Sequence, residues 1–525
     1  MIGSFRQSMT WLHTWASLIF CWILYFMFVT GTLGYFDTEI DHWMQPEIVS
    51  LDQVPTENRV NAAVAHLQEN AQGADNWFIN FGESREDRNL RVFWRSPGET
   101  EDDPPVNNDV RLDARTGAPI SDVARDTGGG QLLYRMHYVL HYIDRDIAFR
   151  LVGILTLLMF VGMITGIVAH KNIFKDFFTF RPKKGQRSWL DLHNLLSVSS
   201  LPFQLMITYS GLLFVSALWM PLVVVGSVGF DTQKAQTLFN FAQVQVEPAG
   251  EPGPLANVAA MVADAEAEWG NGSVIRLSID QPGDANGRVI IGPSGSLDIL
   301  PGNRVYDATT GEYLRTTDRP ESAPLTFAAT MLGLHEGLFA GPIMRWLYFF
   351  SGLLGTAMVA TGAVYWTAKR RKKAVDQKQS RGFRFVEIMN IGTIMGVLIG
   401  VAGFFWANRL LPVGMEDRAE WEVHVMFIVW GLCLLYPLAR SRQMAWRDLT
   451  WVAAVAYGAL PVVNALTTDV GLINSINRGD WVMAGFDLTA LATGFVLAGA
   501  ATYMTRKKVV EPAVEQEIVA EMATS

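Results

Sequence analysis

Histidine is the residue type in this chain whose placement most clearly points to chemistry. Nine histidines occur, and seven of them lie in or beside long apolar stretches. An ionisable side chain in a membrane is energetically costly, so each such histidine is a candidate functional residue. Six of them form two groups at opposite ends of the apolar stretches, with His13, His170 and His193 at one end and His137, His141 and His335 at the other.

These two groups cannot share one metal ion. His141 and His170 flank the same apolar stretch and are 29 residues apart. A continuous helix of that length is about 43 Å long, which is the width of a membrane with its interfaces. Haem iron needs only one axial histidine from each of two helices at equal depth. Two layers of histidines in a helical bundle therefore suit haem iron.

His137 and His141 lie four residues apart in the segment Met-His-Tyr-Val-Leu-His. On one helix they project from the same face, so they cannot hold one porphyrin from opposite sides. In one alternative, one of them binds haem with a residue of another helix while the other meets a propionate. In the other alternative, both hold a zinc or copper ion with His335 as third ligand.

The elements that position these histidines are predicted membrane helices. Half of the 525 residues are hydrophobic and only 18% are charged. Scanning for about 18 or more apolar residues, the length that crosses the hydrocarbon core, gives eight candidate spans. They cover residues 10–35, 148–170, 192–226, 344–368, 385–410, 421–439, 448–466 and 485–504. The expected fold is a mainly α membrane protein with about eight transmembrane helices.

Glycines are frequent in these spans and let helices, or a flat ring, approach closely. They are Gly31, Gly34, Gly162, Gly166, Gly211, Gly352, Gly355 and Gly362. Small residues also pack membrane helices without any cofactor, so the glycines alone do not show whether the bundle holds a cofactor. The only cysteines, Cys21 and Cys433, lie inside apolar runs, which excludes a disulfide framework or a thiolate metal cluster.

The charge pattern predicts one orientation. The net charge is −9, yet the basic residues cluster in short stretches at 171–187, 369–373, 440–447 and 506–508. Short basic loops stay on the cytoplasmic side, so we expect both termini on the cytoplasmic side of the membrane. The two long acidic segments, 36–147 and 227–343, then lie on the outer side, where they are simply solvated or dock a partner.

The two acidic segments resemble copies of one another. Each offers a helical stretch, at 56–70 and 255–269, followed by strand-like runs at 77–81 and 90–94 or at 274–279 and 288–291. Each then reaches a β-turn, Leu112-Asp-Ala-Arg-Thr-Gly or Tyr306-Asp-Ala-Thr-Thr-Gly. Since a histidine and a returning apolar stretch follow in both, the first 368 residues are predicted to be a tandem duplication.

Several motifs together carry a family resemblance. They are Trp11-Leu-His-Thr-Trp, the paired Asp-Ala-x-Thr-Gly turns, Leu140-His141, the run from His170 through Phe-Phe-Thr-Phe-Arg-Pro, Ser188-Trp-Leu-Asp-Leu-His-Asn and Leu334-His-Glu-Gly. In combination they resemble the PepSY-associated transmembrane helix family over roughly residues 5–370. The resemblance implies two periplasmic α+β PepSY-like modules among the membrane helices.

The expected order of parts follows from this resemblance and from the spans. A first membrane helix in 1–35 precedes module 1 in 36–135, and membrane helices 2 and 3 in 136–226 precede module 2 in 227–333. A fourth helix in 334–370, a four-helix membrane segment in 385–505 and a cytoplasmic tail in 506–525 complete the chain. That C-terminal segment departs from the simplest family members and contains a single histidine, His424.

The resemblance also implies two b-type haems. By position, His13, His141, His193 and His335 match the family's helix-opening histidines, and His170 matches a subset with a Phe-rich cytoplasmic loop. We expect His141 with His335 to bind the outer haem, and two of His13, His170 and His193 to bind the inner one. His137 remains a further cofactor-binding candidate, and His424 is expected to be an interfacial histidine.

The function implied by the resemblance is reduction of a periplasmic ferric siderophore by a haem-dependent oxidoreductase. No Gly-x-Gly-x-x-Gly or Walker lysine segment occurs, so electrons are expected from a cytoplasmic partner or the quinone pool. Nucleic acid is not an expected partner. The alternatives are a transporter of iron, haem or siderophore, and a non-enzymatic PepSY regulatory module.

Overall fold

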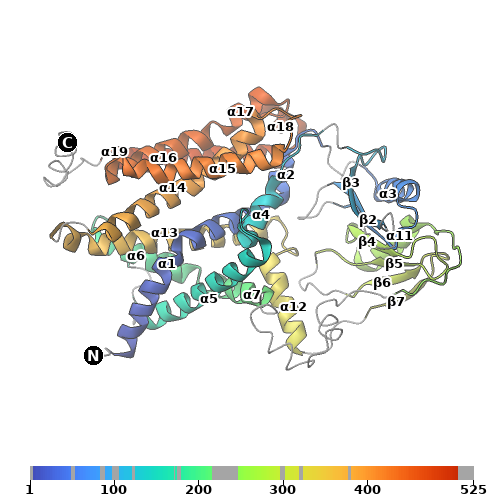
Figure 1. The fold of residues 1–525 in the computed structure, drawn as a ribbon, viewed down its shortest axis with the longest axis horizontal. Helices are drawn as coiled ribbons and strands as arrows, with labels where there is room; N and C mark the ends of the chain where they lie inside the picture. The colour runs from blue at the N-terminus through green and yellow to red at the C-terminus, as the bar shows by residue number, and fades with distance from the viewer. Residues whose placement is uncertain are drawn as a thin grey trace. The chain divides into compact units, whose positions relative to one another are not determined.

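The computed structural model describes residues 4–48, 54–82, 89–96, 106–120, 124–170, 172–173, 175, 179–215, 246–295, 302–317, 323–376 and 380–506. The chain divides into two compact units, Met1–Tyr365 and Trp366–Ser525. Figure 1 shows the helices and strands of both units. Each unit has its own packed interior and is described by itself.

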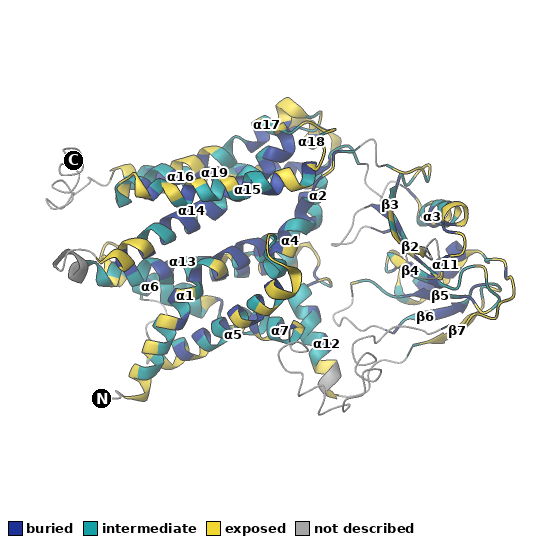
Figure 2. Ribbon diagram, viewed as in Figure 1, coloured by how far each residue is buried: buried dark blue, intermediate teal, exposed yellow. Residues whose placement is uncertain are grey.

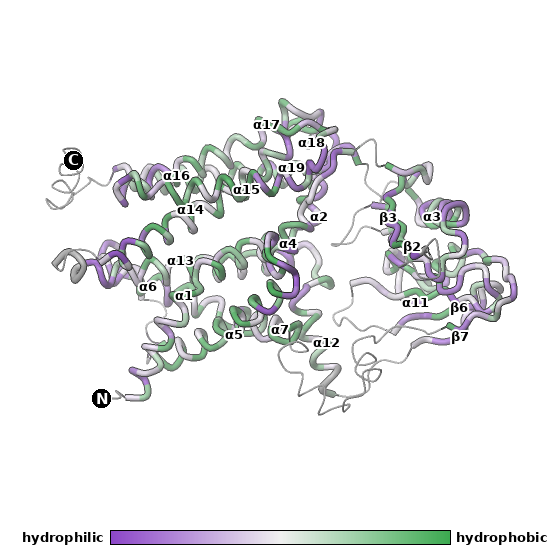
Figure 3. The backbone as a smooth tube through the Cα atoms, in the orientation of Figure 1, coloured by the Kyte–Doolittle hydropathy of each residue, from purple (hydrophilic) through white to green (hydrophobic). Residues whose placement is uncertain are grey.

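The first unit holds the membrane helices of the duplicated region. They are α1 (Phe5–Leu33), α5 (Arg145–Ala169), α6 (Gln186–Ser199), α7 (Leu201–Phe214) and α13 (Pro342–Asp376), whose last residues pass into the second unit. The short helices η1 (Gly34–Phe36) and α2 (Asp37–Met44) continue α1, while α4 (Gly129–Val139) precedes α5 and α12 (Ala323–Glu336) precedes α13. Figure 3 shows the apolar character of these segments.

The third predicted span is bent rather than continuous. Helices α6 and α7 meet at an angle of 67° around Ser200. Pro202, at the start of α7, lacks the backbone N–H and crowds the carbonyl of the preceding turn, which breaks a helix. The predicted span over 192–226 corresponds, in its described part, to this bent pair, and residues 216–226 lie outside the described residues.

Counting this bent pair as one span, the described residues contain eight candidate membrane spans. The predicted class, a mainly helical membrane protein, is confirmed. The bilayer is therefore the environment of these helices.

The hydrophilic segments fold as predicted into helices and strands. The helices are α3 (Thr56–Asn70) and α11 (Val258–Trp269), and the strands are β1 (Asn76–Asn80), β2 (Leu90–Ser96), β3 (Val106–Leu112), β4 (Arg276–Asp280), β5 (Arg288–Ile291), β6 (Arg304–Asp307) and β7 (Tyr313–Thr316). Both predicted turns form. In each, the aspartate, Asp113 or Asp307, accepts hydrogen bonds from backbone amides two and three residues ahead.

The strands of the two segments form one sheet, in the order β3-β2-β1-β4-β5-β6-β7. Strands β1 and β4 join the two copies by antiparallel pairing, with Phe78 opposite Ser278 at the centre. The sequence predicted two separate modules, and the structure joins them edge to edge. Pairing of β1 with β4 gives each copy a neighbour for a strand that would otherwise end the sheet.

The hydrophobic core of this sheet domain lies on one face. Helices α3 and α11 pack against each other and on that face. Alternate strand residues such as Trp77, Ile79 and Val92 join them in one buried cluster. The alternate positions of the same strands point to the opposite face, as the period of two residues in a strand requires.

The described residues of the second unit contain four candidate membrane spans. Helices α14 (Arg381–Leu410), α15 (Arg418–Leu435) and α19 (Trp481–Arg506) each form one, and α16 (Arg442–Gly458) with α17 (Leu460–Thr467) forms the other. The short helices η3 (Tyr436–Leu438) and α18 (Leu472–Arg478) lie in two of the connections. Figure 2 shows α14 as the most continuously buried of these helices, in agreement with the 78% buried share of its apolar window.

Candidate paired-histidine centres

The structure brings His13 and His193 together. His13 lies near the beginning of α1 and His193 lies in the middle of α6. Their ring centroids are 6.4 Å apart, and the ring planes are inclined by 51°. These are two of the three histidines that the sequence placed in the inner layer.

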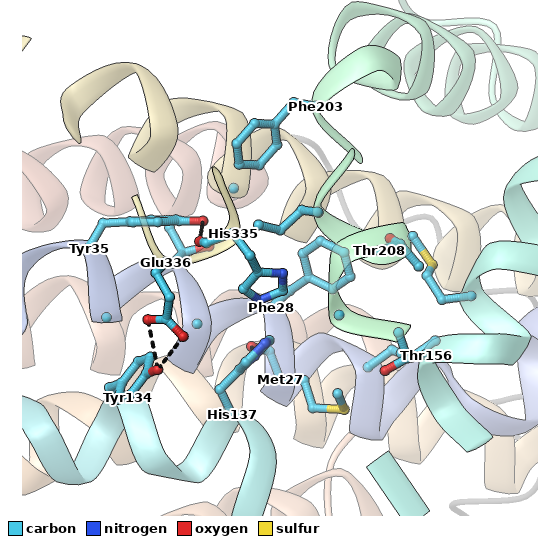
Figure 4. A pocket seen from close by; sticks show the side chains of 18 residues that line it. Met27, Phe28, Tyr35, Tyr134, His137, Thr156, Phe203, Thr208, His335 and Glu336 are labelled. Atoms are coloured by element: carbon cyan, nitrogen blue, oxygen red, sulfur yellow. Dashed lines mark hydrogen bonds between the residues drawn. The ribbon is translucent and has the colours of Figure 1, made fainter. Parts of the chain in front are cut away.

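A second pair consists of His137 on α4 and His335 on α12. The ring centroids of this pair are 6.3 Å apart, with an angle of 46° between the ring planes. Both rings line one cavity, together with Tyr134 and Glu336. Figure 4 shows the two imidazoles pointing toward one another inside it.

Three of the four rings are held directly by a carbonyl of another helix, and the fourth is linked to a carbonyl through a hydroxyl. Nδ1 lies 2.7 Å from the Gly162 oxygen in His13, 3.0 Å from the Met358 oxygen in His193 and 2.7 Å from the Met27 oxygen in His137. A carbonyl only accepts, so Nδ1 carries the proton and donates. Nε2 is then left with its lone pair, the arrangement in which histidine binds a metal.

His335 is held in a similar way, with a hydroxyl added. Its Nδ1 lies 2.9 Å from the Ser210 oxygen, to which it can donate. The Ser210 hydroxyl in turn reaches the Ile207 carbonyl at 3.1 Å. The acceptor group of His335 thus combines a side chain and a carbonyl of α7.

A glycine makes room for each ring. In all four cases it lies four residues after the carbonyl that holds the ring. A β-carbon would come within 2.6 Å of the His137 ring at Gly31, within 3.1 Å of His13 at Gly166, within 3.1 Å of His193 at Gly362 and within 3.3 Å of His335 at Gly211. The close approach of the imidazoles therefore requires these four of the eight glycines noted in the sequence.

A hydroxyl residue precedes each of these glycines. Thr30, Thr165, Ser210 and Thr361 donate to the carbonyl three residues earlier, and that carbonyl is the one that holds the ring. The seat of each histidine is thus the dipeptide Ser/Thr-Gly on a facing helix. This short signal was present in the sequence, and Gly31 and Gly211 each lie 18 residues after a paired histidine.

The seats follow the tandem duplication. In the first copy, the ring of His13 on α1 donates to a carbonyl of α5. The ring of His137, which precedes α5, donates to a carbonyl of α1. In the second copy, His193 of α6 rests on the α13 seat, and His335, before α13, rests on the α7 seat. Each copy therefore holds its own two histidines, and each pair forms where the two copies meet.

The two pairs lie at different levels of one helical bundle. His13 and Met27, which holds His137, are 14 residues apart on α1, a separation of about 21 Å along the helix axis. Apolar side chains fill the space between, including Leu24, Met159 and Met163. The two-layer arrangement expected from the sequence is present.

The paired geometry fits haem iron. Two imidazoles that bind one iron from opposite sides have centroids about 6.2–6.4 Å apart, because a metal–nitrogen bond is about 2.0–2.1 Å long and the centroid lies about 1.1 Å behind the nitrogen. The separations of 6.4 and 6.3 Å agree with this value. A small metal ion with three protein ligands fits less well, since the described residues contain no group of three or more His, Cys, Asp or Glu able to hold one.

His141 is not the partner of His335, which corrects the sequence-based pairing. Helix α4 ends at Val139, and Leu140 and His141 have φ values of 56° and 30°. His141 therefore does not share a helical face with His137, and its ring packs on Tyr142 at 4.6 Å between centroids. The predicted zinc or copper site of His137, His141 and His335 is not formed either.

The remaining candidate histidines lie outside the two pairs. His170 ends α5, and its Nε2 accepts a hydrogen bond of 2.9 Å from Asn194, the residue after His193. His424 lies in the second unit, where its ring packs on Trp421 at 5.3 Å. His170 therefore borders the His13–His193 pair, and the interfacial position expected for His424 stays a prediction.

A phenol and a carboxylate connect the two helices of the second pair. The Tyr134 hydroxyl of α4 donates to both carboxylate oxygens of Glu336 on α12, at 3.1 and 3.0 Å. Burial, and then the charge of Glu336, raise the pKa of Tyr134, so the phenol keeps its proton and remains a donor. Because each residue is within three positions of a paired histidine, this contact fixes α4 against α12 beside the cavity.

The C-terminal helices contain a buried polar network. Asn408 donates to Glu422 at 2.8 Å, Arg409 to Asn464 at 2.9 Å and Asn464 to Asp487 at 3.0 Å. All five side chains are at most 5% exposed. The charged groups lie near helix ends, as the sequence indicated, and their contacts fasten α14, α15, α17 and α19 to one another.

The sequence profile of the PepSY-associated TM region matches residues 10–369, which is more than half of the chain. The chain belongs to the PepSY-associated TM family. Both histidine pairs lie inside the matched region, and the C-terminal helices α14 to α19 lie beyond it. A comparison with curated proteins gives no significant match.

Proposed function

We propose that this member of the PepSY-associated TM family is a di-haem b reductase that passes electrons across a bacterial inner membrane to a periplasmic ferric siderophore. One observation carries the proposal: two pairs of imidazoles at two levels of one bundle, each pair with centroids 6.3–6.4 Å apart. A structural role alone does not explain four rings placed in this way, because single histidines that only pack need no opposed partner.

The residues that would hold the two cofactors follow from the pairs. His13 and His193 would bind one haem b, and His137 and His335 would bind the other, each through Nε2. Bound haem supplies a one-electron couple, whose potential depends on axial ligands, hydrogen bonds and burial. The Nδ1 hydrogen bonds to carbonyls keep each ring in the tautomer and the orientation that ligation requires.

The direction of electron flow rests on the distribution of charge in the sequence. The basic stretches place the His13–His193 end of the bundle at the cytoplasmic face, with both termini inside. With haem bound at both pairs, an electron from a cytoplasmic partner or a quinol would enter at that pair and leave at the His137–His335 pair. The acceptor is a ferric siderophore, since reduction to ferrous iron weakens binding by hard oxygen ligands.

An absorption spectrum with a pyridine haemochrome count tests this proposal. We expect about two b-type haems per chain, reduced by dithionite and reoxidised when ferric siderophore is added. The variants His193→Ala and His335→Ala are each expected to remove one of the two signals and retain the other. A chain purified without haem from haem-replete cells would refute the reductase and favour a transporter or a regulatory module.

A further inference from the structure

The sheet domain has a second face that α3 and α11 do not cover. Trp77 and Ile79 of β1 point to the helices and are buried, whereas Phe78 between them points to the other face and is 51% exposed. The register of β3, β2, β1 and β4 continues this alternation across four strands. The helix-free face of these strands, the open face, has an unusual composition.

Arginines stand side by side across the open face. Arg111 of β3 lies opposite Arg91 of β2, Arg91 lies opposite Asn80 of β1, and Asn80 lies opposite Arg276 of β4. Neighbouring strands are about 4.8 Å apart, so this row of three guanidinium groups spans about 14 Å. Like charges directly opposite one another are destabilising, and Asp109 on the same face offsets part of this repulsion by pairing with Arg91.

A row of aromatic side chains runs beside the arginines. Phe78 lies opposite Phe93 on the adjacent strand. The guanidinium carbon of Arg91 lies 4.4 Å from the centre of the Phe93 ring, and Arg91 also pairs with Asp109. An exposed phenylalanine next to guanidinium groups offers both an apolar surface and a cation–π or stacking surface.

The charge of the open face is opposite to that of the whole chain. On these four strands it carries four arginines, Arg91, Arg95, Arg111 and Arg276, against two aspartates, Asp109 and Asp280. The chain as a whole has 42 basic and 51 acidic residues. The acidic character read from the sequence therefore does not describe this surface, which suits an anionic ligand.

We propose that the open face binds an anionic aromatic chelate of ferric iron, of which a catecholate siderophore is the chemical type. Guanidinium groups bind the negatively charged oxygens of such a ligand by charge-assisted hydrogen bonds, and the Phe78–Phe93 pair stacks on its aromatic rings. This assignment rests on the proposed reductase function for the role of the ligand, and it specifies the class of acceptor.

Equilibrium binding to the full-length protein in nanodiscs tests the assignment. The probes are a trianionic ferric tris-catecholate complex and an uncharged ferric trihydroxamate. We expect the tris-catecholate to bind in preference, and the double variant Arg111→Gln/Arg276→Gln to weaken its binding about tenfold or more. Phe78→Ser is expected to weaken the same complex, with the haem content unchanged. Equal binding of both probes, or unchanged binding in the double variant, would overturn the assignment.

Arg115→Gln supplies the matched control, because Arg115 lies in the turn after β3 rather than on the open face. It removes one positive charge from the same domain and is expected to leave binding unchanged. Failure of the two proposals is distinguishable. A haem-free protein that binds the tris-catecholate through Arg111 and Arg276 refutes the reductase alone. Haem that tris-catecholate reoxidises equally fast in wild type and double variant refutes the docking face alone.

Discussion

Replacing Gly31 with alanine tests the reasoning about the histidine seats most directly. An alanine β-carbon at this position would lie 2.6 Å from Nδ1 of His137. Ordinary contacts between such atoms are about 3.5 Å or longer, so the ring has to move by almost 1 Å. That movement breaks the 2.7 Å hydrogen bond to the Met27 carbonyl and withdraws the ring from the position opposite His335.

The expected cost follows from these contacts. Overpacking of this kind costs about 1–3 kcal/mol, and the lost hydrogen bond adds about 1 kcal/mol. Alanine favours the helix by about 1 kcal/mol relative to glycine, which offsets part of the cost. The net loss of about 1–3 kcal/mol weakens haem retention by the His137–His335 pair about 5- to 150-fold, with no loss of helix stability.

Haem stoichiometry after a fixed dialysis is the measurement. Gly31→Ala should fall from two haems per chain toward one, and the remaining spectrum should be that of the His13–His193 pair. Gly211→Ala is the control at the same centre, because its β-carbon would lie 3.3 Å from His335 and needs only a small adjustment. Retention of two haems by Gly31→Ala would refute the assignment of Gly31 as the position that makes room for the His137 ring.

Three further predictions concern single side chains. His141→Ala should retain both haem signals, whereas His137→Ala should lose one, and the opposite result in a reduced-minus-oxidised spectrum would contradict the pairing described above. Tyr134→Phe should broaden or shift the signal of the His137 centre while haem at the other centre is unaffected, because α4 loses its contact with Glu336; identical spectra would show that this contact does not position the ring. Asp307→Asn should make the stability of the sheet domain less sensitive to acid. Burial alone would raise the pKa of Asp307, but hydrogen bonds from its turn and a nearby arginine lower this pKa overall. The stabilisation that ionised Asp307 provides is therefore present above the ordinary aspartate pKa of about 3.9 and is lost as pH falls through the lower pKa of the folded state. Acid titration followed by circular dichroism checks this, and coincident curves for variant and wild type would count against it.

The membrane class and the duplication were readable from the sequence because they depend on local properties. A run of apolar residues long enough to cross the bilayer forms a helix wherever it lies. The Asp-Ala-x-Thr-Gly turns also depend only on nearby groups, since Asp113 and Asp307 bond amides within three residues. For the same reason, the helix predicted over 56–70 coincides with α3.

Local sequence patterns did not predict which of His137 and His141 pairs with His335. Both belong to one short segment with the same composition, and a helix through both would have placed them on one face. The helix instead ends at Val139, and the left-handed conformation of Leu140 turns His141 away. Helix α4 also packs against α1 and α2, and these contacts are not encoded by any pattern within the segment.

The sequence by itself determined the membrane spans, the repeated α+β segments and the two layers of histidines, because hydropathy and turn chemistry act between residues close in the chain. The tertiary structure alone decided which histidines face each other, which carbonyls hold them and how the sheet is joined. The physical reason is distance along the chain: His193 rests on a carbonyl 165 residues away, and Phe78 of β1 pairs with Ser278 of β4. Contacts of this kind depend on how the two copies pack together.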